Sequence, residues 1–152
     1  MKAITWLASF TVGAATLTSV AFANTPEGWT TDLEKAFAQA KTENKAVLVE
    51  FTGSDWCPPC IMMRKNVFTK KEFVDGASKN FILVELDFPK GDPEVKKQNQ
   101  PHLKKYQVSG FPTVILFDSE GEEFTRFVAS RYKTTEEFLA HINKALENKD
   151  LD

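Results

Sequence analysis

The stretch VEFTGSDWCPPC, residues 49–60, decides how this chain folds and contains both of its cysteines. It begins inside an apolar, β-branched run, residues 46–51, which is typical of a strand buried on both faces. A Thr-Gly-Ser break follows, and a helix is predicted to start near Cys57 and to continue through Val67. The two cysteines therefore lie where a buried strand gives way to a helix.

The start of a helix is a favourable place for a reactive thiol. Unpaired backbone N–H groups and the positive end of the helix dipole stabilise a thiolate at Cys57, which makes this sulfur a nucleophile. Cys60 lies one turn further on and faces the helix interior. It is close enough to close a disulfide and is suited to act as the resolving thiol.

Two other uses of the cysteine pair stay open at this point. A structural disulfide is one, although a loop this short gains little from being closed. A metal site is the other, and it would need ligands beyond the two sulfurs. The chain offers four further candidates for such ligands: His102, His141, Met62 and Met63.

Working outward, hydrophobic periodicity predicts helices and strands in alternation. The helices are expected over residues 31–44, 57–67, 69–80 and 135–148, and the strands over 46–51, 81–86, 113–117 and 123–129. The last two strands should form an antiparallel hairpin. This order predicts an α/β sandwich with a mixed sheet covered by helices on both faces.

Local signals predict how several of the helices start and stop. Thr31 with Glu34 forms a capping-box pattern before the first helix, and Thr69 with Glu72 forms another before the third. In the polar segment 87–107, an Asp-Pro pair at 92–93 predicts a capped helix start. The proline at 101 is expected to interrupt whatever helix forms there.

Composition excludes several classes of function. The chain has 152 residues, enough for one domain with a proper core, and a formal net charge of -2. No lysine or arginine cluster lies among aromatic residues as a nucleic-acid-binding face would require, so nucleic acid is not expected as a partner. We expect a monomer without a resident metal or cofactor.

The first residues have the pattern of a secretory signal peptide. Lys2 supplies positive charge, residues 3–20 carry none, and Ala-Phe-Ala at 21–23 fits the small-x-small cleavage rule. We therefore predict a signal peptide over 1–23, cleavage before Asn24, and a single domain over 24–152 that is periplasmic or secreted. The alternative is an uncleaved membrane anchor.

In the cysteine motif and its place between a strand and a helix, the chain resembles the thioredoxin superfamily. The resemblance is closest to small exported bacterial thioredoxin-like proteins, whose active-site strand runs into FTGSDWC, here residues 51–57. It also includes LDFP at 86–89, KYQV at 105–108 and GFPT at 110–113. The resemblance implies a three-layer sandwich with a central mixed sheet of about four strands.

The resemblance also implies roles for residues outside the cysteine pair. In the family, the proline corresponding to Pro112 is cis and packs against the reactive disulfide. It leaves the backbone of the preceding residue, here Phe111, free to pair with an extended substrate segment. An ordinary trans proline at a strand entry is the alternative. Trp56 is expected to shield the disulfide and, with Phe111, to offer an apolar surface to substrates.

Family members bury a carboxylate beneath the resolving cysteine, and Glu50 is the candidate for it here. It is the ionisable residue of an otherwise apolar strand, where burial should raise its pKa and let it take the Cys60 proton. The alternative is a carboxylate that points out from an exposed strand face. Glu85 lies at roughly the place where a thioredoxin often carries a lysine near this acid.

Together these features predict an extracytoplasmic thiol-disulfide oxidoreductase. Cys57 would attack a disulfide of a partner protein and Cys60 would resolve the mixed disulfide. Because Pro58 and Pro59 supply no N–H groups to the Cys57 sulfur, the thiolate should be only modestly stabilised, which favours a reductase. A membrane-bound reductase is expected to supply electrons. The alternative is a non-catalytic module, either a thiol-based copper carrier or a thioredoxin fold that holds substrates.

Overall fold

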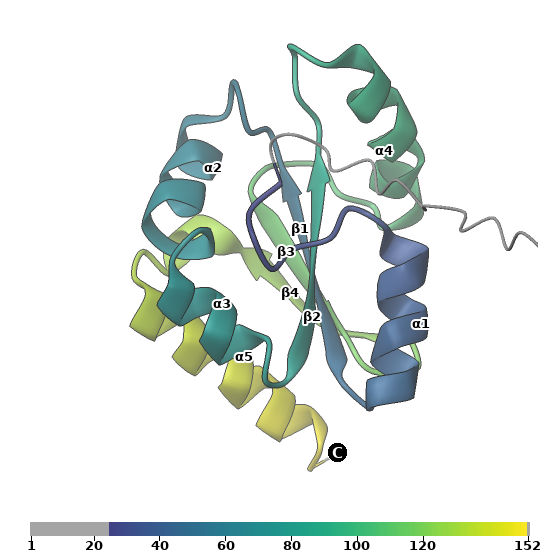
Figure 1. Ribbon diagram of the computed structural model, residues 1–152, viewed down its shortest axis with the longest axis vertical. Coiled ribbons are helices and arrows are strands. Elements are labelled where there is room, and N and C mark those ends of the chain that lie inside the picture. Colours follow the sequence, from purple (N-terminus) through teal and green to yellow (C-terminus); the bar gives the residue numbers. More distant parts are fainter. Residues whose placement is uncertain (1–24, 152) are drawn as a thin grey trace, which may run out of the picture.

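The computed structural model describes residues 25–151, so the predicted signal peptide lies outside the described residues. One mixed sheet lies between two layers of helices, and its strand order is β2-β1-β3-β4 (Figure 1). The strands are β1 (Ala46–Thr52), β2 (Phe81–Asp87), β3 (Thr113–Phe117) and β4 (Glu123–Val128). The predicted α/β sandwich with a four-stranded mixed sheet is therefore confirmed.

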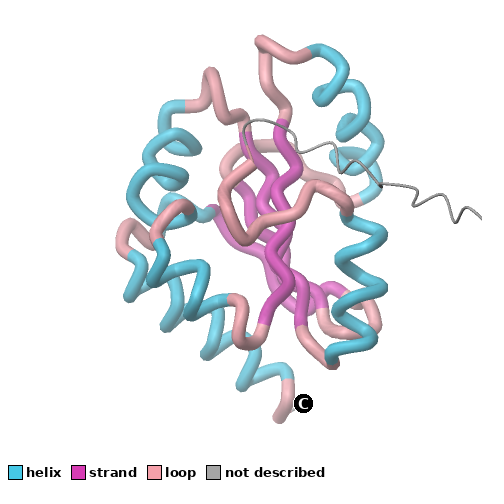
Figure 2. Tube along the Cα trace, viewed as in Figure 1, coloured by secondary structure: helices cyan, strands magenta, loops and turns pink. Residues whose placement is uncertain are grey.

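Helices cover both faces of the sheet (Figure 2). One face carries α1 (Leu33–Glu43) and α4 (Pro93–Lys105). The other carries α2 (Pro58–Met63), a π-helical turn (Arg64–Phe68), α3 (Lys71–Ala77) and α5 (Thr135–Lys149). A short 3-10 turn, Ala129–Arg131, joins β4 to the segment before α5. No helix within residues 25–151 has the length and apolar composition needed to cross a membrane.

Strand β1 lies in the middle of the sheet and organises it. It pairs in parallel with β2 over its whole length and antiparallel with β3 from Val47 to Phe51. β3 and β4 form the predicted antiparallel hairpin. Every residue of β1 is buried, as its nearly continuous apolar sequence indicates.

The side chains of β1 alternate between two hydrophobic cores. Leu48 belongs to the core beneath α3 and α5, whereas Val47 and Val49 belong to the core beneath α1. Aromatic rings fill much of the first core, which accounts for part of the high phenylalanine content. The rings in mutual contact there are Trp29, Phe68, Phe73 and Phe138.

The predicted capping box of the first helix is wrong by one residue. Asp32, not Thr31, is the N-cap of α1, and its carboxylate accepts a hydrogen bond from the Lys35 N–H at 3.0 Å. The chain is extended just before this point, because Thr30 bridges to Val84 of β2. Aspartate caps a helix at least as well as threonine, so the later residue takes the role.

The predicted capping box of the third helix is also wrong. α3 begins after Lys70, which makes no side-chain capping hydrogen bond. The Thr69 hydroxyl instead donates to the Arg64 carbonyl at 2.8 Å. The same carbonyl also accepts the Thr69 backbone N–H at 3.1 Å, so Thr69 closes the π-helical turn instead of capping α3.

The segment between β2 and β3 folds as α4, capped by Asp92 as predicted, with its carboxylate accepting from the Glu94 and Val95 N–H groups. The predicted interruption at Pro101 is wrong, because the helix continues through it. Pro101 and Lys97, one turn earlier, are both exposed. The carbonyl that lacks its helical donor there can be satisfied by water.

Replacing Phe138 by alanine should destabilise the protein by about 3–5 kcal/mol, because the ring is fully buried and its removal leaves a cavity. Urea unfolding of the purified protein measures the change. Leu151→Ala is the control, since that side chain is 85% exposed and should change stability by less than about 0.5 kcal/mol. Equal effects of the two substitutions would contradict this placement of the core.

Candidate active site at the start of helix α2

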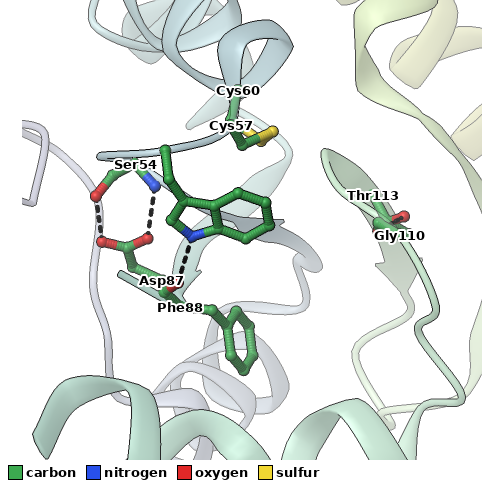
Figure 3. The surroundings of a disulfide bond; sticks show 8 residues. Ser54, Cys57, Cys60, Asp87, Phe88, Gly110 and Thr113 are labelled. Atoms are coloured by element: carbon green, nitrogen blue, oxygen red, sulfur yellow. Dashed lines mark hydrogen bonds between the residues drawn. A yellow bond between two sulfur atoms is a disulfide. The ribbon is translucent and has the colours of Figure 1, made fainter. Parts of the chain in front are cut away.

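Cys57 and Cys60 form a disulfide at the N-terminal end of α2, with their Cα atoms 5.2 Å apart (Figure 3). Cys57 is the N-cap residue, and the two prolines that follow occupy the first turn of the helix. Cys60 is fully buried, whereas Cys57 is 5% exposed. The two sulfurs are thus placed unequally, with Cys57 toward the surface and Cys60 toward the interior.

Trp56 is fixed beside the disulfide by contacts with four residues. Its indole N–H donates to the Phe88 carbonyl at 2.8 Å, and its ring lies edge-on to that of Phe111 at 5.9 Å. Lys90 lies over the ring, with Nζ 5.1 Å from the centroid. Gly53 lies so close beneath the ring that a Cβ there would come within 2.6 Å of it. Trp56 is nevertheless 39% exposed, so it keeps an apolar surface next to Cys57.

The loop before β3 lies across from the disulfide, as the positions of Gly110 and Thr113 show in Figure 3. The Phe111-Pro112 peptide bond is cis, as the family resemblance implies. Pro112 is buried, and its carbonyl accepts a hydrogen bond from the Ala129 N–H at 3.0 Å. Phe111 is half-buried, and its ring stacks on Phe88 at 5.2 Å.

Two aspartates that sequence reasoning gave no role anchor the loop in front of the disulfide. Asp87, at the end of β2, accepts hydrogen bonds from both the backbone N–H and the hydroxyl of Ser54 (Figure 3). Asp55 accepts from the N–H groups of Lys90 at 2.9 Å and Gly91 at 2.6 Å. Both aspartates were part of quoted family motifs, but their partners are 33 to 36 residues away in sequence and leave no local signal.

Glu50 lies in the centre of β1 with only 2% of its surface exposed, so the alternative of an outward-pointing carboxylate is wrong. Its Oε1 atom is buried and has no hydrogen-bond partner among the described residues. Burial raises the pKa of the Glu50 carboxyl well above its ordinary value, and the nearby charge of Glu85 adds to this effect. Both effects favour the protonated form of Glu50.

Glu85 lies in β2 directly beside Glu50, since the two are register partners in parallel strands. Arg64, in the turn that follows α2, donates to a Glu85 carboxylate oxygen at 2.7 Å. Burial raises the pKa of Glu85 to about 7, while the Arg64 charge acts in the opposite direction. A second buried carboxyl group thus lies beside Glu50, and sequence reasoning placed it there without finding its arginine partner.

The other candidate metal ligands are dispersed. His102 on α4 packs against Tyr106, and His141 on α5 stacks on Tyr132 at 4.1 Å. Met63 is buried in the core, whereas its neighbour in sequence, Met62, is 53% exposed. Within the part of the chain that the structure describes, no three His, Cys, Asp or Glu side chains are grouped to hold a metal ion.

Comparison with known proteins places these features in context. The sequence profile of a family described as thioredoxin-like matches residues 28–119. A disulfide bond reductase, DsbH of Chlamydia pneumoniae, is 37% identical over 95 residues, which cover 60% of this chain and 57% of that protein. The thiol:disulfide interchange protein DsbD of Vibrio cholerae is 29% identical over 74% of this chain, but the match spans only 18% of DsbD.

A solved structure extends the similarity to most of the chain. The structure named DsbH oxidoreductase superposes with a TM-score of 0.70 and 27% sequence identity, covering 90% of this chain and 95% of that one. The curated relatives are longer than the matched region, since this chain spans 57% of DsbH of Chlamydia pneumoniae and 18% of DsbD of Vibrio cholerae.

The buried carboxyl groups predict how stability depends on pH. The pKa values of Glu50 and Glu85 are both raised in the folded protein. The folded chain therefore keeps protons that the unfolded chain releases above 4.5, the ordinary pKa of a glutamate. Stability therefore falls as the pH rises from that value, by at most about 1.4 kcal/mol per pH unit for each carboxyl.

Glu50→Gln should make this decline shallower, by up to that amount per pH unit, because it removes one of the retained protons. Urea unfolding of the oxidised protein at pH 5, 6 and 7 measures the slope. Glu120→Gln is the control, since this carboxylate is exposed and should leave the slope unchanged. Parallel slopes for wild type and Glu50→Gln would contradict the burial of an uncompensated carboxyl at this position.

Proposed function

This chain belongs to the thioredoxin-like family, and from that premise we propose that it is an extracytoplasmic thiol-disulfide oxidoreductase acting on protein substrates. The observation that carries the proposal is the unequal placement of the two sulfurs, with Cys57 at the cap of α2 and Cys60 fully buried one turn later. A thiolate at a helix cap is stabilised by the helix end, and a buried second thiol reacts only after the first has done so.

In the proposed reaction, the Cys57 thiolate attacks one sulfur of a substrate disulfide. A Cys57-substrate disulfide forms, and the other substrate sulfur leaves as a thiolate with the electron pair of the broken bond. Cys60 then loses its proton and attacks the Cys57 sulfur, which closes the Cys57-Cys60 disulfide and releases the second substrate thiolate. The substrate gains two electrons and the protein loses two.

Residues around the disulfide support binding of an extended substrate segment. The backbone of Phe111 makes no hydrogen bond with another described residue, and the strand that follows begins only at Thr113. A substrate strand could therefore pair with Phe111 next to the cis proline, Pro112. Trp56, whose ring contacts that of Phe111, adds an exposed apolar surface next to Cys57.

Glu50 is proposed as the acid-base group of the resolving step. It lies two residues beyond Leu48 on the face of the sheet that packs beneath the helical layer containing α2. A buried carboxyl group in this position can exchange a proton with a buried thiol such as Cys60. Its raised pKa favours the protonated form, so this group needs a route for losing its proton before it can accept another.

We propose that the physiological direction is reduction of extracytoplasmic disulfides. Pro58 and Pro59 occupy the first turn of α2, so two N–H groups that could stabilise the Cys57 thiolate are missing. A less stabilised thiolate makes the dithiol a stronger reductant. The Chlamydia pneumoniae relative DsbH is named a disulfide bond reductase, which agrees with this direction.

The location and the electron donor are proposed from sequence and chemistry. The charge pattern and small-residue site of residues 1–23 support export. A reductase in an oxidising compartment must be reduced again after each turnover, and a membrane-bound thiol reductase is the class of donor that fits. The monomeric state stays a prediction.

Replacing Cys57 by serine should abolish reduction of insulin disulfides, because it removes the attacking sulfur. Cys60→Ser should instead trap substrates as mixed disulfides on Cys57, visible as adducts that a reductant removes. Wild-type turnover with no adduct on the Cys60→Ser variant would contradict the order of attack. Low turnover together with tight stoichiometric binding of Cu(I) by the reduced wild type would favour the copper-carrier alternative.

The reduction potential measured against glutathione should lie near that of thioredoxin, about -270 mV, rather than near the roughly -120 mV of a strong oxidant. Pro59→His restores one N–H donor and adds a group that can carry positive charge. It should shift the potential in the oxidising direction by about 30 mV for each tenfold stabilisation of the thiolate form. A wild-type value near that of the strong oxidant would overturn the proposed direction.

A further inference from the structure

Two buried carboxyl groups lie side by side beneath the active-site helix. Glu50 and Glu85 are register partners in adjacent parallel strands, and each lies two residues after a leucine of the same core, Leu48 and Leu83. Because side chains alternate along a strand, both carboxyl groups point to the face that packs against the layer containing α2. Two carboxyl groups this close cannot both be ionised without a large cost.

Arg64 decides which of the two carries the charge. Its guanidinium is 2.7 Å from a Glu85 carboxylate oxygen, whereas Glu50 Oε1 has no hydrogen-bond partner among the described residues. The negative charge is therefore on Glu85 and the proton on Glu50. Arg64 is also tied to the resolving cysteine, since it lies one helical turn after Cys60 and its backbone N–H donates to the Cys60 carbonyl.

Glu85 also connects this buried pair to solvent. It lines an open pocket of about 420 Å³ beside the end of β2, together with Thr31, Ser54 and Asp87. Glu50 is buried and does not line this pocket. A proton that leaves Glu50 therefore has a route to water through Glu85.

We propose that Glu85, held by Arg64, is the group that carries the Cys60 proton from Glu50 to solvent. This inference rests on the proposed function, because it assigns the proton path of the same resolving step. Glu85 touches neither sulfur and acts through Glu50, so it is a positioning residue for the reaction. Arg64 positions Glu85 and favours its ionised form, which is the form that can accept a proton.

The Cys60 proton reaches solvent through two linked proton transfers. Glu50 gives its proton to the Glu85 carboxylate and takes the proton of the Cys60 thiol, so the net change is a Cys60 thiolate and a protonated Glu85. The thiolate attacks Cys57 and displaces the substrate thiolate, as in the proposed function. Glu85 then releases its proton to water in the pocket, and the resting charge distribution returns.

The charged groups around Glu85 set the pH at which this path operates. Arg64 faces it from the turn after α2 and favours its ionised form. Glu50 on β1 and Asp87 on β2 are the acidic groups beside it. Asp87 is itself held by Ser54 from the loop before α2. With these neighbours, the resolving step should show an inflection near pH 7, where Glu85 changes its protonation state.

The test separates the two chemical steps by single-turnover reaction of the reduced full-length protein with limiting DTNB, a chromogenic aromatic disulfide. Attack by Cys57 releases the first thiolate, and resolution by Cys60 releases the second. The main variant is Arg64→Met/Glu85→Gln, which removes both charges together and so avoids leaving one buried charge unpaired. The matched control is Lys71→Met/Asp75→Asn, which removes an exposed ion pair on α3.

We expect the first phase to be unchanged in both double variants. The second phase should be about tenfold slower at pH 7 in Arg64→Met/Glu85→Gln and should lose its inflection, because the proton path is gone. A second phase with wild-type rate and pH profile in this variant would overturn the proposal. Absence of both phases in the wild type would instead mean that the proposed function fails.

A single substitution keeps the proposal testable if the double variant does not fold. Arg64→Met leaves Glu85 free to take up a proton, so no unpaired charge remains buried at neutral pH. Without the arginine charge, the inflection of the second phase should move to higher pH, while the first phase stays unchanged. An inflection that does not move would overturn the role given to Arg64 and Glu85.

Discussion

The pairing of β1 with a strand on each side is the constraint on which the rest of this structure depends. A strand that is bonded along both edges and covered on both faces has no water available to any of its side chains. Its end also fixes where α2 can begin, and thus where Cys57 is held. The same strand therefore positions the less deeply buried sulfur, Cys57, near its end and the buried carboxyl group, Glu50, in its middle.

Burial in this strand gives Glu50 its chemical character. Burial without a partner for one carboxyl oxygen favours the protonated form of Glu50. In this protein a second carboxyl, Glu85, and an arginine are provided on the neighbouring elements. In the proposed reaction, the positions of these charged groups, and not the cysteine motif alone, determine how Cys60 is deprotonated.

Much of the fold could be predicted from sequence, because long apolar runs and their periodicity depend mainly on burial. All four strands, the hairpin and the helix at residue 57 followed from such runs. Helix starts were harder to predict, since Asp32 and Thr31 are both good caps and the tertiary bridge at Thr30 decided between them. Pro101 was misjudged because an exposed helix tolerates a missing hydrogen bond that a buried one does not.

The candidate site likewise combines features that could be predicted from local sequence with features that could not. The cysteines and the cis proline, Pro112, follow local motifs, and the burial of Glu50 follows from its strand. The arginine on Glu85 and the two aspartates that hold the active-site loop could not be predicted, because each contact joins segments far apart in the chain. Spatial proximity of this kind leaves no periodic trace in a single sequence.

The ties between residues 54–56 and residues 87–91 have a consequence for protein engineering. Two aspartates and the indole of Trp56 bind these segments to each other next to the disulfide. The conformation of the cysteine loop therefore depends on the segment at residues 87–91. Transplanting it onto another scaffold would require moving the second segment with it, and an exchange of either segment alone would leave its hydrogen-bonding groups without partners.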